Sequence, residues 1–233
     1  MADWEPGLSR RDRRRMATRE EILAAARGVL LEAGPEGLSL REVARRSEFS
    51  PASLYTYFSS KDEILASLFA ESFQRLDAYL RRVPADLPPD KRIVELGMAY
   101  LDFGRENPMD LRCILTATAF ESLPPSSGVA LGLGAARMIA DTFREGMERG
   151  VFPVEGPLSA AEMTYATWAL VHGMVSVSKV ELGEAAEILG ADPRRVLEAW
   201  VGLLAEAGKR QARSTESKEA AVNLPLPARD EDR

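Results

Sequence analysis

Residues 39–58 read SLREVARRSEFSPASLYTYF, and this stretch contains two short helix signals separated by a tight turn. Ser39 followed by Glu42 has the form of a capping box, in which the serine oxygen accepts a bond from the backbone three residues on and the glutamate reaches back. Ser50 followed by Pro51 is a cap residue with a proline at the first helical position. Two short helices joined by about four residues have the size and order of a helix-turn-helix, which places its second helix in the major groove of DNA.

The second helix of this motif has an inner and an outer side. Leu54 and Phe58 lie four residues apart and are expected to turn inward, whereas the small or hydroxylated residues before them suit a close approach to base edges. Thr56 and Tyr57 fall on the outer side, where their oxygens can bond to phosphates. Tyr55 fits either side of this helix, because its spacing also suits a core position.

Helix signals continue through the rest of the chain. Apolar residues recur at three- and four-residue spacing, and each run is bounded by a cap residue, a proline or a glycine. No alternating strand pattern or hairpin signal appears. The pattern predicts an all-α protein with further helices at about residues 18–33, 60–83, 90–106, 108–123, 127–149, 160–182 and 193–210.

Composition excludes several classes of protein. The chain has 233 residues, of which 45% are apolar and 28% charged, as in an ordinary soluble globular protein. It has no run of 18 uncharged apolar residues and no hydrophobic signal core at its start, so we expect neither a membrane span nor export. A single cysteine and a single histidine leave almost no ligands for zinc. We therefore expect a cytoplasmic protein without a metal or other cofactor.

Charge is distributed unevenly along the chain. The net charge is −6, yet residues 1–61 hold 11 of the 30 basic and only 9 of the 36 acidic side chains, so this end is positive. Six arginines lie between Arg10 and Arg19, opposed locally only by Asp12. Such an arm fits DNA phosphates or a narrow minor groove. The alternative is a solvated tail, since charge runs at termini are common.

Three stretches of the chain resemble the TetR family of bacterial transcriptional regulators. They read TREEILAAA from Thr18, GLSLREVA from Gly37, preceded by Gly34, and SPASLYTYFSSK from Ser50. The resemblance spans about residues 17–70 with the family's spacing unbroken. It implies a TetR-like dimer with a DNA-binding domain at 17–77 and a ligand-binding and dimerisation domain at 78–210. Composition adds a flexible basic arm at 1–16 and a disordered tail at 211–233, where little apolar surface is available to offset the entropy of ordering.

The resemblance also assigns DNA contacts residue by residue. It implies phosphate contacts for Thr18, Arg19, Ser39, Tyr57 and Lys61. It implies contacts with bases or their immediate backbone for Arg41, Ser50, Pro51, Ala52, Ser53, Tyr55 and Thr56. Arg41 is the candidate for a bidentate contact with guanine O6 and N7, and its alternative is a solvated arginine on the first helix of the motif.

One position departs from the family pattern. The family commonly has glycine in the turn of the motif, where the backbone is left-handed, whereas residues 47–50 here read SEFS. A glutamate in that conformation costs roughly 1 kcal/mol and adds a negative charge near the DNA. We expect either an adjusted turn or a slightly less stable domain.

The second half of the chain carries a weaker resemblance. AYLDFGRENP from Ala99 and WALVHG from Trp168 resemble the TetR C-terminal domain type named for its Trp, His and Gly. The helix at 160–182 is apolar nearly all round, which predicts burial on several sides and, with residues 196–204, half of a four-helix dimer interface. Candidate ligand contacts are Met98, Phe103, Cys113, Phe120, Met138, Trp168 and His172. Each is alternatively a core residue, and His172 a hydrogen-bonded core histidine.

These patterns favour a regulator over an enzyme. The sequence has no glycine-rich phosphate loop, no histidine pair and no nucleophile beside a base. We expect a homodimeric repressor, without a membrane partner, that binds a palindromic operator in double-stranded DNA and is released by a small apolar or amphipathic inducer. The alternative is an all-α interaction adaptor or small-molecule carrier, which leaves the basic arm and the motif without a purpose.

Overall fold

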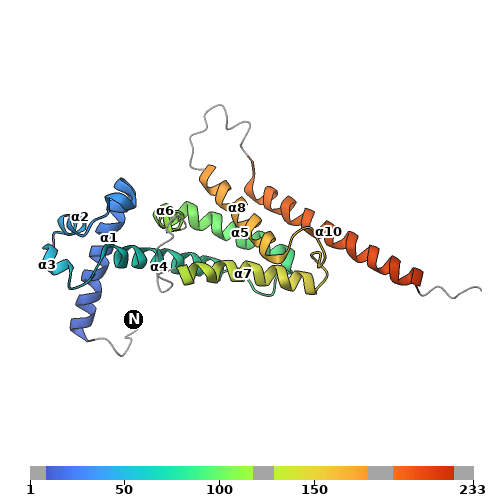
Figure 1. The fold of residues 1–233 in the computed structure, drawn as a ribbon, viewed down its shortest axis with the longest axis horizontal. Coiled ribbons are helices and arrows are strands. Elements are labelled where there is room, and N and C mark those ends of the chain that lie inside the picture. The colour runs from blue at the N-terminus through green and yellow to red at the C-terminus, as the bar shows by residue number, and fades with distance from the viewer. Residues whose placement is uncertain (1–8, 118–128, 178–190, 223–233) are drawn as a thin grey trace, which may run out of the picture. The chain divides into compact units, whose positions relative to one another are not determined.

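A computed structural model describes residues 9–117, 129–177 and 191–222 of the protein, and every regular element among them is an α-helix (Figure 1). The all-α prediction is therefore confirmed for this part of the chain. The helices are α1 (Arg10–Gly37), α2 (Leu40–Arg46), α3 (Pro51–Leu54), α4 (Lys61–Leu80), α5 (Pro89–Glu106), α6 (Pro108–Ala117), α7 (Val129–Glu148), α8 (Ala160–Val177) and α10 (Pro193–Val222).

The helices divide into two compact units. The first unit contains residues 1–79 and 103–135, and the second contains residues 80–102 and 136–233. The first unit thus holds α1 to α3, nearly all of α4, and α6. The second holds most of α5 and α7, together with α8 and α10.

The core of the first unit is built from one face each of α1 to α4. Ile22, Val43 and Leu54 are fully buried, and Phe58 is 1% exposed. Burying a side chain of this size contributes about 1.5–3 kcal/mol. Leu54 and Phe58 therefore hold the short α3 and the turn after it against the core of the first unit, as their four-residue spacing predicts.

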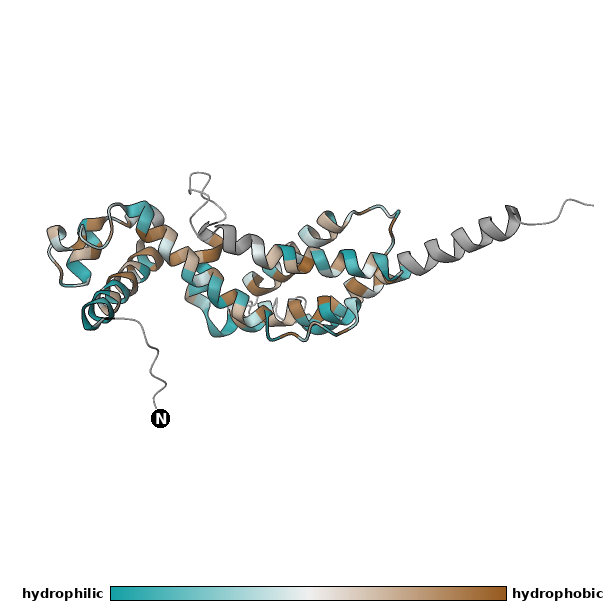
Figure 2. Ribbon diagram, turned by 90° about the horizontal axis from the view of Figure 1, so that it is seen from below, coloured by the Kyte–Doolittle hydropathy of each residue, from teal (hydrophilic) through white to brown (hydrophobic). Residues whose placement is uncertain are grey.

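α1 begins eight residues earlier than expected. The Ser9 hydroxyl accepts a bond from the backbone N–H of Asp12 at 3.1 Å and donates to its carboxylate at 2.7 Å, which caps the helix before Arg10. Residues 10–16 are therefore helical, and the expected flexible arm does not extend over them. Figure 2 shows polar colouring at the start of α1 and apolar colouring on its later turns. The predicted stop is present at Gly34, whose φ of 67° interrupts the helix.

A buried polar network joins α4 to α6 in the first unit. The Asp110 side chain, only 4% exposed, accepts a bond from the Ser72 hydroxyl at 3.0 Å and one from the Arg75 guanidinium at 2.5 Å. Beside it, Arg27 on α1 donates to Glu71 at 2.7 Å. Because a buried carboxylate needs such partners, these bonds fix the register of α6 against α4.

Two glycines allow close packing in the second unit. A Cβ atom at Gly146 would lie 2.3 Å from the ring of Phe152, which packs against Phe143 with ring centroids 5.1 Å apart. A Cβ atom at Gly97 would lie 2.8 Å from Leu197. Neither position can accept a larger side chain without moving its neighbour, so both glycines are explained by packing.

Two helices of the second unit begin at side-chain caps. At the start of α8, the backbone and hydroxyl of Ser159 both donate to Glu162, at 2.8 and 2.7 Å. At the start of α10, the Asp192 carboxylate accepts a bond from the backbone N–H of Arg194 at 3.0 Å. Local side-chain chemistry therefore fixes where both helices begin.

The C-terminal end differs from the expected tail. α10 continues past residue 211 to Val222. Residues 205–222 consist largely of alanine, glutamate, lysine, arginine and glutamine, which favour helix, and the next proline is Pro225. Low hydrophobicity alone does not end a helix, and residues 223–233 lie outside the described part of the chain.

Candidate nucleic-acid interface

The predicted motif is present as α2, a tight turn and α3. The Ser39 hydroxyl accepts a bond from the backbone of Glu42 at 3.2 Å, and the Ser50 hydroxyl accepts one from the backbone of Ser53 at 3.1 Å. Each helix therefore has the expected cap. α3 ends at Leu54 and is continued by turns, with the backbone N–H of Phe58 still bonded to the Leu54 carbonyl at 3.0 Å.

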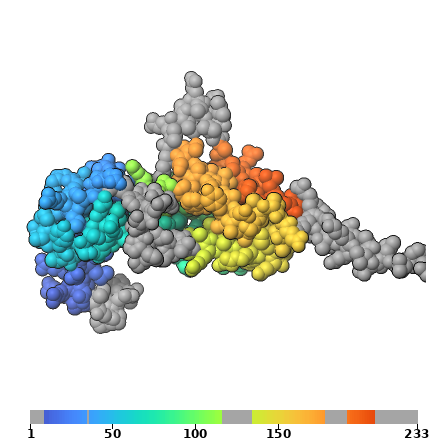
Figure 3. Space-filling view, in the orientation of Figure 1, coloured from blue at the N-terminus to red at the C-terminus, as the bar shows by residue number. Residues whose placement is uncertain are grey.

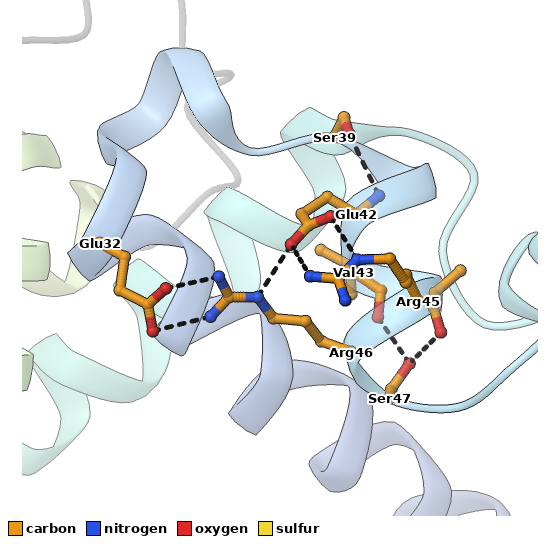
Figure 4. A network of polar contacts seen from close by, with 8 residues as sticks. Glu32, Ser39, Glu42, Val43, Arg45, Arg46 and Ser47 are labelled. Atoms are coloured by element: carbon orange, nitrogen blue, oxygen red, sulfur yellow. Dashed lines mark hydrogen bonds and ion pairs between the residues drawn. The ribbon is translucent and has the colours of Figure 1, made fainter.

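The prediction that Glu42 completes the capping box by reaching back to Ser39 is wrong. Instead of reaching back to Ser39, the Glu42 carboxylate accepts bonds from Arg45 at 2.7 and 2.9 Å and from Arg46 at 3.0 Å (Figure 4). Arg46 also donates to Glu32 on α1 at 2.5 and 2.8 Å. These charge-assisted bonds tie α2 to α1, and they hold the pKa of Glu42 at about 2, chiefly through Arg45 and then Arg46.

This network predicts a pH dependence of stability. Because the pKa of Glu42 is lower in the folded chain than its usual value of 4.5, the carboxylate stabilises the fold above about pH 4.5. The contribution is lost as the pH falls from there to about 2. Urea unfolding should show that Glu42→Gln is less stable than wild type at pH 6, with the difference shrinking toward pH 3. A difference that stays constant over this range would contradict the assignment.

The turn between the helices contains a strained glutamate. The backbone N–H of Phe49 bonds to the carbonyl of Ala44 at 3.0 Å, as in a Schellman motif, and Glu48 lies at the position that takes a left-handed conformation, with φ 59°. The turn is therefore not adjusted to avoid the strain that the sequence predicts.

Glu48→Gly should stabilise the protein by about 1 kcal/mol, because glycine adopts positive φ without a steric penalty. Chemical denaturation at neutral pH measures the gain. Glu48→Ala is the matched control, since it removes the same charge and keeps the Cβ atom. Equal stabilisation by both variants would show that charge rather than backbone strain is responsible.

The predicted reading surface is exposed. Tyr55 is 58% exposed, which places it on the outer side rather than in the core. Tyr57 is half-buried. The remaining residues expected to meet bases from α3 and its flanking turns are all exposed: Ser50, Pro51, Ala52, Ser53 and Thr56. The structure therefore brings these side chains to one accessible edge of the first unit.

Arg41 differs from the other arginines of α2. Arg45 and Arg46 are bound to carboxylates, whereas exposed Arg41 has no ion-pair partner among the residues that the structure describes. Its guanidinium is therefore available to a ligand. Of the predicted phosphate contacts, Ser39 is exposed and both Thr18 and Lys61 are half-buried.

Arg19 has an internal role that the sequence reasoning missed. Its guanidinium donates to the Ser67 hydroxyl at 2.8 Å and lies 4.5 Å from the ring centroid of Phe58. Arg15, like Arg19, makes contacts within the first unit. It donates to the Thr56 carbonyl at 3.2 Å and lies 5.5 Å from the Tyr57 ring. The available signal was spacing, because Arg15 and Arg19 continue the inward stripe of α1 that includes Ile22.

The predicted ligand contacts do not gather around one cavity. The second unit contains a cavity of about 490 Å³, lined by Leu80, Arg81, Val83, Ala85, Arg92, Leu96, Met138, Asp141, Thr142 and Glu145. Only Met138 belongs to the predicted set. Phe103 and Cys113 are fully buried in the first unit, and Met98 is half-buried in the second. Phe120 lies outside the described residues.

His172 behaves as a hydrogen-bonded packing residue. Its Nδ1 bonds to the Tyr100 hydroxyl, and its ring centroid lies 4.8 Å from that of the half-buried Trp168. Burial lowers the pKa of His172, so the neutral imidazole is favoured. Within the described ranges, no cluster of three or more histidine, cysteine or acidic side chains can hold a metal ion, and no helix is both long and apolar enough to span a bilayer.

Comparisons with known proteins agree with this geometry. Residues 22–68 match the family model of bacterial regulatory proteins, tetR family. An uncharacterized HTH-type transcriptional regulator of Mycobacterium tuberculosis is 43% identical over 61 residues, which are 26% of this chain and 29% of that one. The HTH-type transcriptional repressor KstR of the same species is 26% identical over 151 residues, covering 64% of this chain and 67% of the repressor.

The similarity to solved structures covers more of the chain than the family model does. The TetR family transcriptional regulator PfmR of Thermus thermophilus superposes with a TM-score of 0.60 at 22% identity, covering 80% of this chain and 97% of that structure. The match to the uncharacterized regulator spans less than a third of that relative's length. The fold and the exposed α3 define a helix-turn-helix protein. Over residues 22–68 the chain is similar to bacterial regulatory proteins of the tetR family.

Proposed function

We propose that the protein is a transcriptional repressor that binds double-stranded DNA in the cytoplasm and is not an enzyme. The observation that carries the proposal is the exposed edge formed by α3 and Arg41. Residues Ser50 to Ser53 are small enough for the helix to approach base edges closely, and Arg41 offers a bidentate donor to guanine. Thr18, Ser39, Tyr57 and Lys61 are proposed to contact phosphates. Arg19 is left out of this set because its partners lie within the domain.

A homodimer is supported by the surface of the second unit. Tyr165 and Val177 on α8 are 69% and 42% exposed, and Leu203 on α10 is 65% exposed. A Cβ atom at Gly173 or Gly202 would meet nothing within 4 Å, so packing within the chain does not explain glycines in the interior of these helices. Such exposed apolar residues and glycines suit close packing against a second copy. The expected burial of α8 on several sides then requires the partner.

Leu203→Glu should therefore abolish the dimer, because it places a charge in an apolar interface. Sedimentation equilibrium at micromolar concentration should give a single chain for this variant and two chains for wild type. Glu198→Gln, an exposed change on the same helix, is the control and should leave the dimer intact. A wild-type monomer, or a dimeric Leu203→Glu variant, would contradict the proposed interface.

A small-molecule inducer is supported by the cavity of the second unit. Its lining combines the apolar side chains of Leu80, Leu96 and Met138 with charged groups such as Arg92 and Glu145. The Arg92 guanidinium bonds to Glu145, and its buried Nε has no partner among the described residues. This combination fits an amphipathic molecule better than a purely apolar one.

A gel shift tests the function. The complete chain is titrated at fixed salt against duplex DNA from upstream of its own coding sequence and against a scrambled duplex of equal length. The proposal expects tight binding to the first duplex and at least 10³-fold weaker binding to the second. Equal binding to both duplexes, or binding to neither, would contradict it.

A further inference from the structure

The first turns of α1 carry an arginine surface outside the matched family domain. Arg10, Arg11 and Arg14 are exposed, and none of them has an ion-pair partner within the described ranges of the chain. The matched domain begins only at residue 22. The nearby Asp12 carboxylate is held by the backbone and hydroxyl of Ser9, at 3.2 and 2.7 Å, and so caps the helix.

Helix geometry brings these three arginines together. Arg10 and Arg14 are separated by four residues, and Arg11 and Arg14 by three, so they are neighbours along one side of α1. The next acidic side chains, Glu20 and Glu21, lie about 9 Å or more further along the helix axis. Like charges at this spacing destabilise an isolated helix. An anionic partner would relieve that repulsion.

Arg15 fixes this surface beside the reading helix. Arg15 follows Arg11 by four residues and is therefore its neighbour on α1. It donates to the Thr56 carbonyl at 3.2 Å and lies 5.5 Å from the Tyr57 ring. Both partners belong to the turns that directly follow α3. Figure 3 shows the first turns of α1 in dark blue on the surface beside the cyan α3 region. DNA bound at α3 would therefore pass close to the arginine surface.

We propose that Arg10, Arg11 and Arg14 form a second DNA-contacting surface, which binds the phosphate backbone flanking the groove that α3 enters. The assignment rests on the proposed function. The three guanidiniums extend from a helix locked in place rather than from a free tail, so they offer a fixed row of charge that is complementary to phosphates. Contacts of this kind position a protein on DNA and raise affinity for every sequence alike.

Salt dependence tests the assignment. Fluorescence anisotropy measures binding of the complete chain to the upstream duplex and to a scrambled duplex between 50 and 200 mM salt. Each phosphate contact adds about 0.9 to the slope of log K against log salt. The triple variant R10Q/R11Q/R14Q should lower that slope by about 3 per bound chain on both duplexes, while the ratio of the two affinities stays unchanged.

Two matched variants serve as controls. R10K/R11K/R14K keeps the charges and should keep the wild-type slope. K91Q/R137Q/R195Q removes three exposed positive charges from the second unit and should also leave the slope unchanged. Circular dichroism of each variant checks that the helix content is preserved.

The outcomes separate this inference from the proposed function. If wild type binds neither duplex, the proposed function fails, and the arginine assignment fails with it. If wild type binds the upstream duplex and the glutamine variant keeps its slope, the second surface is overturned while the repressor assignment stands. A variant that loses affinity for the upstream duplex alone would show base reading and would overturn the phosphate assignment.

Discussion

Arg41→Ala should weaken binding to the operator by roughly 5- to 150-fold per half-site, because a bidentate arginine–guanine contact contributes about 1–3 kcal/mol. The loss should be confined to operators that retain the guanine, and affinity for scrambled DNA should fall far less. Competition binding with operators changed one base pair at a time measures both effects. The expected pattern is relaxed discrimination at a single position in each half-site.

The control lies on the same helix. Arg45 has the same charge, and its side chain is 69% exposed, but it is bound to Glu42. Arg45→Ala should therefore leave discrimination between base pairs unchanged. If the two variants lose equal affinity at every position, Arg41 acts through charge alone and reads no base.

Asp110→Ala should destabilise the protein by about 2–4 kcal/mol. The substitution removes the carboxylate that accepts bonds from Ser72 and Arg75, and it leaves these donors beside an apolar methyl group. Equilibrium unfolding in urea, followed through helix content, measures the loss. Asp110→Asn keeps an acceptor for Ser72 and should lose about half as much.

An exposed ion pair provides the comparison for Asp110. Asp141 pairs with Arg144 on α7, and both side chains are more than half exposed. Asp141→Ala should change stability by no more than about 0.5 kcal/mol, since exposed pairs contribute little. A similar loss from both aspartates would mean that burial does not set the strength of the Asp110 network.

The parts of the fold that the sequence predicts correctly are those with local signals. Ser39, Ser50 and Ser159 cap helices through atoms only three residues away, so sequence spacing alone locates those helix starts. Leu54 and Phe58 are buried as their four-residue spacing requires. The strain at Glu48 also followed from the turn position that it occupies.

Distant partners explain what sequence reasoning missed. Arg19 meets Ser67, 48 residues away, and Asp110 meets Ser72, 38 residues away, so local spacing does not identify either partner. The cavity is lined from α4, α5, α7 and the segment after α4, and only Met138 among its residues was anticipated. Phe103 is a candidate ligand contact only because of its residue type, and the structure buries it in the core of the first unit.

In the proposed complex, α3 of each of two chains reads DNA at one of two equivalent sites. Hydroxyl-radical footprinting of the complete chain on its own upstream region tests it most directly. Two protected half-sites related by a palindrome are expected, with centres about 34–36 Å, or one helical turn, apart. Uniform protection without defined boundaries, or a single half-site at saturation, would contradict it.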